Sequence, residues 1–236
     1  EIYTLSLHDA LPILHFDPFF AMNAANASQA GLRLGAYIYS YATSVEMAQQ
    51  EADFVLNLIK DYPISFPVVF DAEDANTLGT LTQSQVSDVI NAFCKRIQDA
   101  GYYPMVYANE YWIANKIDMS KISYDIWVAK YQQKYTYSKT SMWQASNTGS
   151  VKGVNGNVDI DYLYKDYTQI IPGNTWRTIA GNRYYYQNHV MQKAAWINDG
   201  QNWYYMNAAG NPSKGWLELS GKKYYLEADG HMISGW

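Results

Sequence analysis

Pro-Val-Val-Phe-Asp-Ala-Glu-Asp, residues 67–74, joins an apolar run directly to three carboxylates. A short apolar run next to a proline is typical of a buried strand, of the kind that a parallel sheet covers on both faces. Side chains alternate along such a strand. Asp71 and Glu73 should therefore point the same way, with Cα atoms about 6.6 Å apart, while Ala72 points elsewhere.

A carboxylate pair has a specific use if this strand belongs to an α/β barrel, because the C-terminal ends of barrel strands carry the catalytic residues. Two acids at that place suit a general acid beside a charge stabiliser, which is the equipment for cleaving a glycosidic bond. The alternative is that the acids only solvate a loop between the strand and the next helix. The stretch by itself does not decide between these interpretations.

Composition limits the classes of partner. The chain has 236 residues and a net charge of −5, which argues against nucleic acid and anionic membranes as partners. Aromatic residues reach 16%, with 23 Tyr and 8 Trp, and flat aromatic faces can stack on sugar rings and quaternary ammonium groups. No run is long and apolar enough to span a bilayer. The four histidines are scattered along the sequence, so we expect no metal site and no cofactor.

The region from residue 14 to residue 163 alternates between helical and strand-like patterns. We expect a helix from Asp17 to Ala30, and capping boxes at Thr43 with Glu46 and at Thr82 with Gln85. The single cysteine, Cys94, falls in the last of these helical patterns and should be a buried thiol. Strands are expected at 32–39, 67–71, 103–108, 125–129, 141–145 and 158–162. This order predicts an α/β fold with a parallel sheet, and an irregular TIM-like barrel because the late strands have little helix between them.

The C-terminal region repeats itself. Its tryptophans are Trp176, Trp196, Trp216 and Trp236, spaced by 20 residues, and each of the first three units carries a tyrosine pair. A fixed short period is typical of a solenoid of small units, here with room for one β-hairpin each. Strand alternation puts Trp203 and Tyr205 on one face and Tyr204 on the other. These aromatics can form the core of the array, or one face can be offered to a ligand.

Residues 14–167 resemble glycoside hydrolase family 25, the muramidases of bacteria and their phages. The matching pieces, in order, are Asn23 with 30–37 (Ala-Gly-Leu-Arg-Leu-Gly-Ala-Tyr), 69–73 (Val-Phe-Asp-Ala-Glu), 107–109 (Tyr-Ala-Asn), 127–131 (Trp-Val-Ala-Lys-Tyr), 143–144 (Trp-Gln) and 158–161 (Val-Asp-Ile-Asp). After a linker at 168–175, residues 176–236 resemble the cell-wall-binding repeats, including choline-binding ones, that often accompany this domain.

The resemblance implies cleavage of the β-1,4 bond between N-acetylmuramic acid and N-acetylglucosamine in peptidoglycan. By position, Glu73 matches the general acid/base, Asp71 the assisting carboxylate and Asp159 the last acid of the site. Apolar neighbours should raise the pKa of Glu73 so that it can protonate the leaving oxygen. The matching aromatic positions of the sugar subsites are Tyr37, Tyr107, Trp127 and Trp143. The family favours retention of configuration, and an N-acetylated substrate could also use its own acetamido oxygen as the nucleophile.

For the repeats, the resemblance implies a wall-polymer site, with choline-bearing teichoic acid or a polysaccharide as the ligand. The candidate ligand-binding residues are Trp196, Trp203, Tyr205, Trp216, Tyr225 and Trp236. Choline cages need an aromatic residue just before the tyrosine pair, and only Trp203 supplies one, because Arg183 and Lys223 stand at that place in the neighbouring units. A wall glycan is therefore at least as plausible a ligand as choline.

Two other functions fit parts of the pattern. The chain could be a non-catalytic cell-wall-binding protein, in which a degenerate barrel serves as a scaffold. It could also be a barrel glycosidase that acts on chitin or another N-acetylated β-glycan. In each case we expect a secreted or wall-associated protein, or a phage endolysin acting on the wall.

Residues 1–13 fit neither resemblance and look like a translated sequencing adapter, so we exclude them from the fold. Family members open with a strand that bears an Asp, followed by a second strand, and nothing in residues 1–16 matches either one. We expect the polypeptide to begin inside its domain and therefore to be poorly active. The measurement is the loss of turbidity of a peptidoglycan suspension, and brisk lysis by this chain would contradict the expectation.

Overall fold

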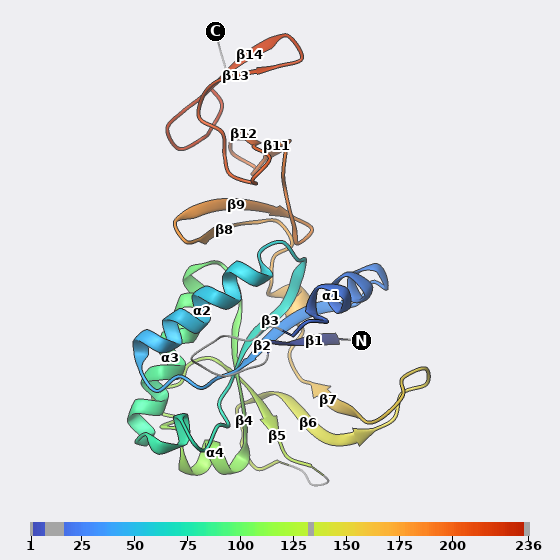
Figure 1. Ribbon diagram of the computed structural model, residues 1–236, viewed down its shortest axis with the longest axis vertical. Helices are drawn as coiled ribbons and strands as arrows, with labels where there is room; N and C mark the ends of the chain where they lie inside the picture. Colours follow the sequence, from blue (N-terminus) through green and yellow to red (C-terminus); the bar gives the residue numbers. More distant parts are fainter. Residues whose placement is uncertain (1, 8–16, 132–134, 234–236) are drawn as a thin grey trace.

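The computed structural model describes residues 2–7, 17–131 and 135–233. It shows a mixed α/β fold with a sheet curled into a half-barrel, followed by a series of β-hairpins (Figure 1). The sheet runs in the order β1 (Ile2–Leu7), β2 (Arg33–Tyr39), β3 (Ile64–Asp71), β4 (Pro104–Asn109), β5 (Asp125–Ala129), β6 (Thr140–Gly149) and β7 (Val158–Leu163). Neighbouring strands are parallel up to β6, and β7 is antiparallel to β6.

Strand β1 corrects one expectation. Residues 2–7 were expected to supply no strand, but they pair in parallel with β2 from Ile2 opposite Arg33 to Leu7 opposite Ile38. The run Ile-Tyr-Thr-Leu-Ser-Leu carries no charge and contains β-branched and aromatic residues, which favour extended backbone. The open edge of β2 offers unpaired backbone groups to such a run. The six strands that the sequence pattern predicts are confirmed as β2 to β7.

The helices begin at different residues from those expected in two cases. Helix α1 (Phe20–Gln29) starts three residues after Asp17, whose carboxylate accepts a hydrogen bond from the Phe19 N–H in the preceding turn. Helix α2 (Val45–Ile59) is capped by Ser44 rather than by Thr43, because the Ser44 hydroxyl accepts from the Met47 N–H. Further α-helices among the described residues of the sheet region are α3 (Gln83–Asp99) and α4 (Glu110–Asn115).

Alternation along the central strands divides the core into two parts. Val68 and Phe70 of β3 belong to the larger cluster, which includes residues of α1, α2 and α3, the helices that cover the outer face of the sheet. Val69 points the other way, into a second cluster with Met105, Trp127 and Met142 on the inner face. Asp71 follows Val69 at an interval of two, so it lies on the inner face. Cys94 is buried in the outer cluster, as expected.

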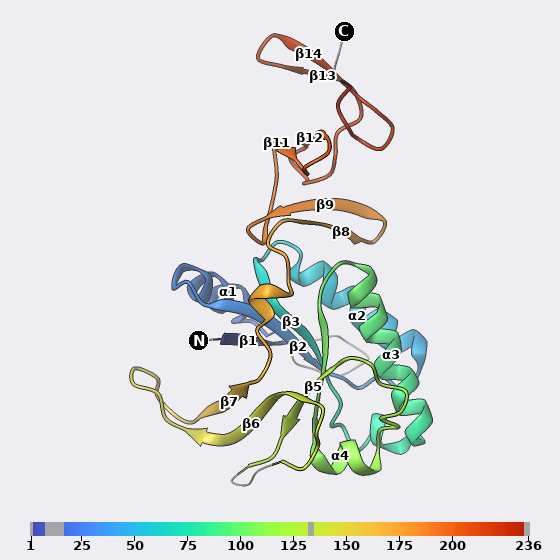
Figure 2. The same ribbon diagram turned by 180° about the vertical axis from the view of Figure 1, so that it is seen from behind.

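The three repeat units form three hairpins, as the spacing of the tryptophans predicts. They are built on β8 (Thr175–Ile179) with β9 (Asn182–Gln187), β11 (Ala195–Asn198) with β12 (Trp203–Met206), and β13 (Gly215–Leu219) with β14 (Lys222–Leu226), and β10 (Val190–Met191) adds to the first. Each hairpin pairs its tryptophan with the second tyrosine of the unit. The hairpins follow one another away from the sheet, and the hairpin of β13 and β14 lies farthest from it (Figures 1 and 2).

The first hairpin is docked onto the α/β part through Arg177, which is only 1% exposed. Its guanidinium lies between the rings of Tyr102 and Tyr186, at 4.0 and 4.2 Å from the centroids, and donates to the Ile64 carbonyl. The Tyr186 hydroxyl also donates to the Lys60 carbonyl. Ile64 begins β3 and Lys60 ends α2, so the hairpins are attached at the opposite end of the parallel strands from Asp71.

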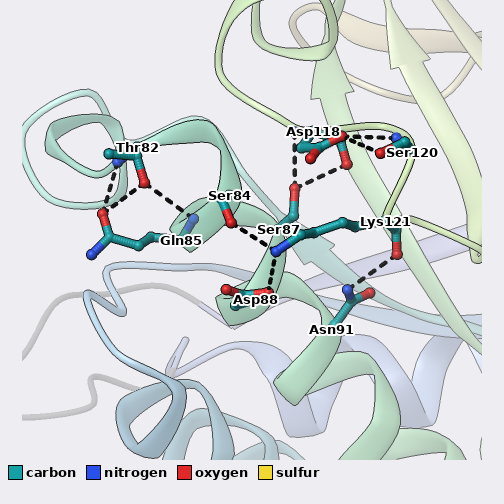
Figure 3. Close-up of polar contacts among 9 residues, drawn as sticks. All are labelled: Thr82, Ser84, Gln85, Ser87, Asp88, Asn91, Asp118, Ser120 and Lys121. Carbon is teal, nitrogen blue, oxygen red and sulfur yellow. Dashed lines mark hydrogen bonds and ion pairs between the residues drawn. The ribbon is translucent and has the colours of Figure 1, made fainter.

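The loop after α4 is fastened to α3 by several polar contacts (Figure 3). Ser87 exchanges hydrogen bonds with the backbone of Asp118, and the Lys121 ammonium reaches both Ser84 and Asp88. At the start of α3 the expected capping box is confirmed, with Thr82 and Gln85 each bonding the backbone of the other. These contacts fix the direction in which the chain enters β5.

Thr82→Ala should lower the free energy of unfolding by about 1 kcal/mol, because it leaves the Gln85 N–H without its cap. Chemical denaturation followed by circular dichroism measures the change. Thr82→Ser keeps the hydroxyl and is the matched control, for which we expect stability close to wild type. Equal stability of the alanine variant and the wild type would contradict a stabilising cap.

Candidate active site

Asp71 is the last residue of β3 and stands between two tyrosines in the register of the sheet, Tyr39 on β2 and Tyr107 on β4. It is 8% exposed, and its Oδ1 has no hydrogen-bond partner among the described residues. Burial raises the pKa of Asp71 to about 8, and the neighbouring charge of Glu73 adds to the rise. A carboxylate without partners in a buried position holds its proton near neutral pH.

Glu73 is held by the next strand. Its Oε1 accepts a hydrogen bond of 2.6 Å from the Asn109 N–H, at the point where β4 ends and Asn109 caps helix α4. Burial raises the pKa of Glu73, in the expected direction, while hydrogen bonds from Asn109 oppose the rise. The two carboxyls interact, so the pair as a unit retains a proton at neutral pH.

Asp74, the third acid of the run, has a different task. Its Oδ1 accepts from the backbone N–H groups of Asn76 and Thr77 and from the Thr77 hydroxyl, so it caps the turn that follows the strand. Its Oδ2 accepts a longer bond of 3.4 Å from the Tyr39 hydroxyl. The structural interpretation of the acidic run therefore applies to Asp74, while Asp71 and Glu73 lack such turn contacts.

A second polar group lies across the inner face and is centred on Gln144 of β6, which is buried. The hydroxyls of Tyr107 and Tyr131 donate to its Oε1 at 2.8 and 2.9 Å. Its Nε2 donates to the Asp159 Oδ2 at 3.0 Å. Gln144 thereby connects β4, the segment after β5 and β7 through one amide.

Asp159 and Asp161 project from the antiparallel strand β7. Desolvation raises the pKa of Asp159. Desolvation also raises the pKa of Asp161 to about 6, although the Trp127 Nε1–H donates to its Oδ1 at 2.8 Å and opposes the rise. These two acids therefore also keep protons more readily than a carboxyl in water does.

The two acidic groups lie close enough to act on the same side chains. Desolvation raises the pKa of Tyr107, and the charges of Glu73 and Asp71 raise it further. Desolvation likewise raises the pKa of Tyr131, and both Glu73 and Asp159 contribute. The structure thus brings the predicted residues Asp71, Glu73 and Asp159 to one end of the inner face.

The four predicted aromatic residues are divided between two faces. Tyr37, Tyr107 and Trp127 pack with the inner-face cluster. Trp143 is adjacent to Gln144 on β6 and points to the opposite face, where it stacks on Tyr162 with ring centroids 5.2 Å apart and donates to the Lys130 carbonyl. Trp143 is therefore not gathered with the carboxylates.

Four residues of this group were not among the predicted site residues: Tyr39, Tyr131, Gln144 and Asp161. Gln144 could have been found from the sequence, because strand alternation places a residue two positions after Met142 on the same face as Met142. Asp161 could have been found in the same way, since it follows Asp159 at an interval of two. Among the described residues, no group of three or more His, Cys, Asp or Glu is placed to hold a metal ion.

The aromatic residues of the hairpins form a ladder. Trp176 contacts Tyr185 of its own hairpin and Tyr204 of the next, with centroids at 5.1 and 4.9 Å. Trp196 repeats this arrangement with Tyr205 and Tyr224, at 5.4 and 4.9 Å. The contacts to the next hairpin through Tyr204 and Tyr224 were missed by the sequence analysis, although the period of 20 residues contains them.

The remaining predicted ligand residues of the hairpins differ in accessibility. Trp203 is 48% exposed and Trp216 is 69% exposed, and Trp216 contacts Tyr225 at 5.2 Å. Trp236 lies outside the described residues. In the part of the chain that the structure describes, no helix has the length and apolar character needed to cross a membrane.

Comparisons with known proteins place these features in context. The profile of the glycosyl hydrolases family 25 matches residues 13–154, and that of a putative cell wall binding repeat matches 195–211 and 214–232. The uncharacterized protein YegX of Escherichia coli O157:H7 is 28% identical over 149 residues, which cover 61% of this chain and 53% of YegX. The chain thus spans about half the length of the curated relatives that it matches.

Several solved structures share the fold, and two of them illustrate the similarity. The CTP1L endolysin has a TM-score of 0.59 and 26% identity, over 72% of this chain and 59% of that one. The spore cortex lytic enzyme SleM of Clostridium perfringens also has a TM-score of 0.59, at 16% identity, over 93% of this chain and 83% of that one. The second similarity concerns the fold alone.

Asp71→Asn should stabilise the fold increasingly as the pH rises. The raised pKa means that the folded state binds the Asp71 proton more tightly than the unfolded chain does, so stability is lost between the ordinary pKa of 3.8 and about 8. The amide carries no charge, so the variant should be more stable than wild type by a few kcal/mol at pH 8 and about equally stable at pH 4. Urea unfolding at both values measures this, with Asp99→Asn at the exposed end of α3 as the control. An equal difference at both pH values would contradict the assignment.

Proposed function

The chain belongs to the glycosyl hydrolases family 25, and we propose that it is a peptidoglycan hydrolase whose active site is the acidic group at the end of β3. The observation that carries the proposal is the buried Asp71 carboxyl, which feels the charge of the half-buried Glu73, with the pKa of each raised by burial. The similarity to the CTP1L endolysin supports a lytic activity directed at the cell wall.

In the proposed reaction, Glu73 is the general acid for the β-1,4 bond between N-acetylmuramic acid and N-acetylglucosamine. Its carboxyl gives a proton to the glycosidic oxygen as the bond to the anomeric carbon breaks, and it later takes a proton from the water that adds to that carbon. The hydrogen bond from Asn109 fixes the carboxyl in place. This residue therefore acts first as an acid and then as a base.

Asp71 stabilises the reaction centre in this scheme. In the free protein the buried Asp71 holds a proton near neutral pH. Positive charge that develops on the sugar ring, or on an acetamido group that attacks the anomeric carbon, makes an ionised Asp71 more favourable. The shared proton of the pair then resides on Glu73, where it is needed. Whether the positive charge develops on the sugar ring or on the acetamido group, the configuration of the anomeric carbon is retained.

The inner-face residues supply the subsites of the proposed site. Asp159 is held by Gln144, and Tyr107 and Trp127 present their rings along the same face. Tyr37 extends this surface on β2. Sugar rings can stack on the aromatic faces while the carboxyls and hydroxyls bind their polar groups.

We further propose a domain division. Residues 14–167 would be part of an irregular TIM-like barrel, 168–175 a linker, and 176–236 a solenoid of hairpins that binds a wall polymer, either a choline-bearing teichoic acid or a polysaccharide. The match of 195–232 to a cell wall binding repeat supports the tail. The protein would then act outside the cell or at the wall.

Glu73→Gln tests the hydrolase. The substitution keeps an oxygen that can accept from the Asn109 N–H but removes the acidic proton, so the release of reducing ends from purified peptidoglycan should fall by about 10²-fold or more. Mass spectrometry of the released fragments detects even a slow wild-type reaction. Glu46→Gln, in the exposed first turn of α2, is the matched control and should retain the wild-type rate.

The outcomes separate the alternatives. Binding to the wall with no release of sugar by the wild type would indicate a non-catalytic wall-binding protein. Faster release from chitin than from peptidoglycan would indicate a glycosidase for another N-acetylated glycan. Unchanged release by the Glu73→Gln variant would rule out Glu73 as the general acid.

A further inference from the structure

The ladder of hairpins contains two corresponding junctions, and one difference between them is the residue just before the tyrosine pair. At the first junction Trp176 faces Tyr204, and at the second Trp196 faces Tyr224, each pair with centroids 4.9 Å apart. The residue just before the tyrosine pair is Arg183 in the first hairpin and Trp203 in the second. The register of the strands makes these residues equivalent, since Arg183 pairs with Thr178 and Trp203 with Asn198.

Arg183 does not point away from the first junction. Its guanidinium carbon lies over the Trp176 ring, 4.1 Å from the centroid, and one of its nitrogens is within 3.5 Å of the Asp229 carbonyl. A cation at this distance over an indole is attracted by the negative face of the ring. The described residues place no comparable cation over the Trp196 ring at the second junction.

The surroundings of the first junction suit a positive charge. The Trp176 Nε1–H donates to the Asp199 carboxylate at 3.1 Å, which adds negative charge to this part of the hairpin. The Asp229 carbonyl faces the guanidinium from the turn that follows the third hairpin. The junction therefore combines aromatic faces with nearby oxygens, which is the chemistry that recognises an alkylated ammonium group.

We propose that Arg183 is a built-in occupant of the first junction, and that its guanidinium holds the place that a quaternary ammonium ligand such as choline would take. The second junction, with Trp196, exposed Trp203 and Tyr224, is then the open one. The inference rests on the proposed wall-binding role of the hairpins and narrows it, because it assigns one junction to the ligand and closes the other.

The test follows each junction separately by nuclear magnetic resonance. The indole N–H signals of Trp176 and Trp196 are assigned through Trp→Phe variants and followed while choline chloride is added at constant ionic strength. In the wild type we expect a saturable shift at Trp196 and none at Trp176. In Arg183→Ala we expect the Trp176 signal to shift as well. The dissociation constant of choline measured at Trp176 should be at least about tenfold lower than in the wild type.

Lys223→Ala is the matched control, because Lys223 occupies the same position in the third hairpin and is exposed. It should leave Trp176 unresponsive. Arg183→Gln, which removes the charge but keeps part of the stem, serves as a second variant if the alanine protein does not fold. Unchanged signals elsewhere in the spectrum show that each variant is folded.

Each possible result either supports or overturns a stated part of the inference. A wild-type response at Trp176, or no response there in either Arg183 variant, would overturn the inference. If Trp196 alone responds in every protein, the wall-binding role stands while the assignment of Arg183 falls. If Trp176 responds only in the Arg183 variants and Trp196 never responds, the assignment of Arg183 stands and the open second junction falls. The hydrolase proposal is judged independently by Glu73→Gln.

Discussion

The alternation of side chains along β3 is the constraint on which the rest of the α/β part depends. Val68 and Phe70 pack under the helices, so Val69 and Asp71 must face the inside of the curled sheet. A shift of register by one residue would turn the carboxyl toward the helices and Phe70 toward the inner face. The hydrophobic outer face therefore positions the acid on the inner face, and the neighbouring strands add Tyr107 and Trp127 at equivalent heights.

The hairpins are stabilised in a different way, because a single hairpin has too small a hydrophobic face to be stable alone. The first gains stability by sharing the core of the α/β part, where Tyr184, Tyr186 and Met191 join the outer cluster. Each later hairpin places a tyrosine against the tryptophan of its predecessor. Each hairpin is therefore stabilised by the one before it, starting from the first hairpin, which Arg177 docks onto the α/β part.

Much of this arrangement could be predicted from the sequence. Period-two patterning located β3 and the direction of Asp71, the capping box located the start of α3, and the 20-residue period located the hairpins. Strand β1 was missed because its residues match no motif, and pairing with an open edge depends on backbone groups rather than on motifs. Arg177 was missed for a tertiary reason, since only the meeting of Tyr102 and Tyr186 buries a guanidinium that a hairpin alone would expose. Gln144 shows a similar limit, because its partners come from three separate segments.

The docking of the hairpins at the start of the parallel strands has a geometric consequence. The acidic group lies at the other end of those strands, so the length of the strands separates it from the tail. If the tail binds a wall polymer as proposed, that polymer lies at the opposite end of the strands from the acidic group. A hydrolase built this way would act on glycan strands that lie away from the polymer it binds, at a distance set by the length of β3.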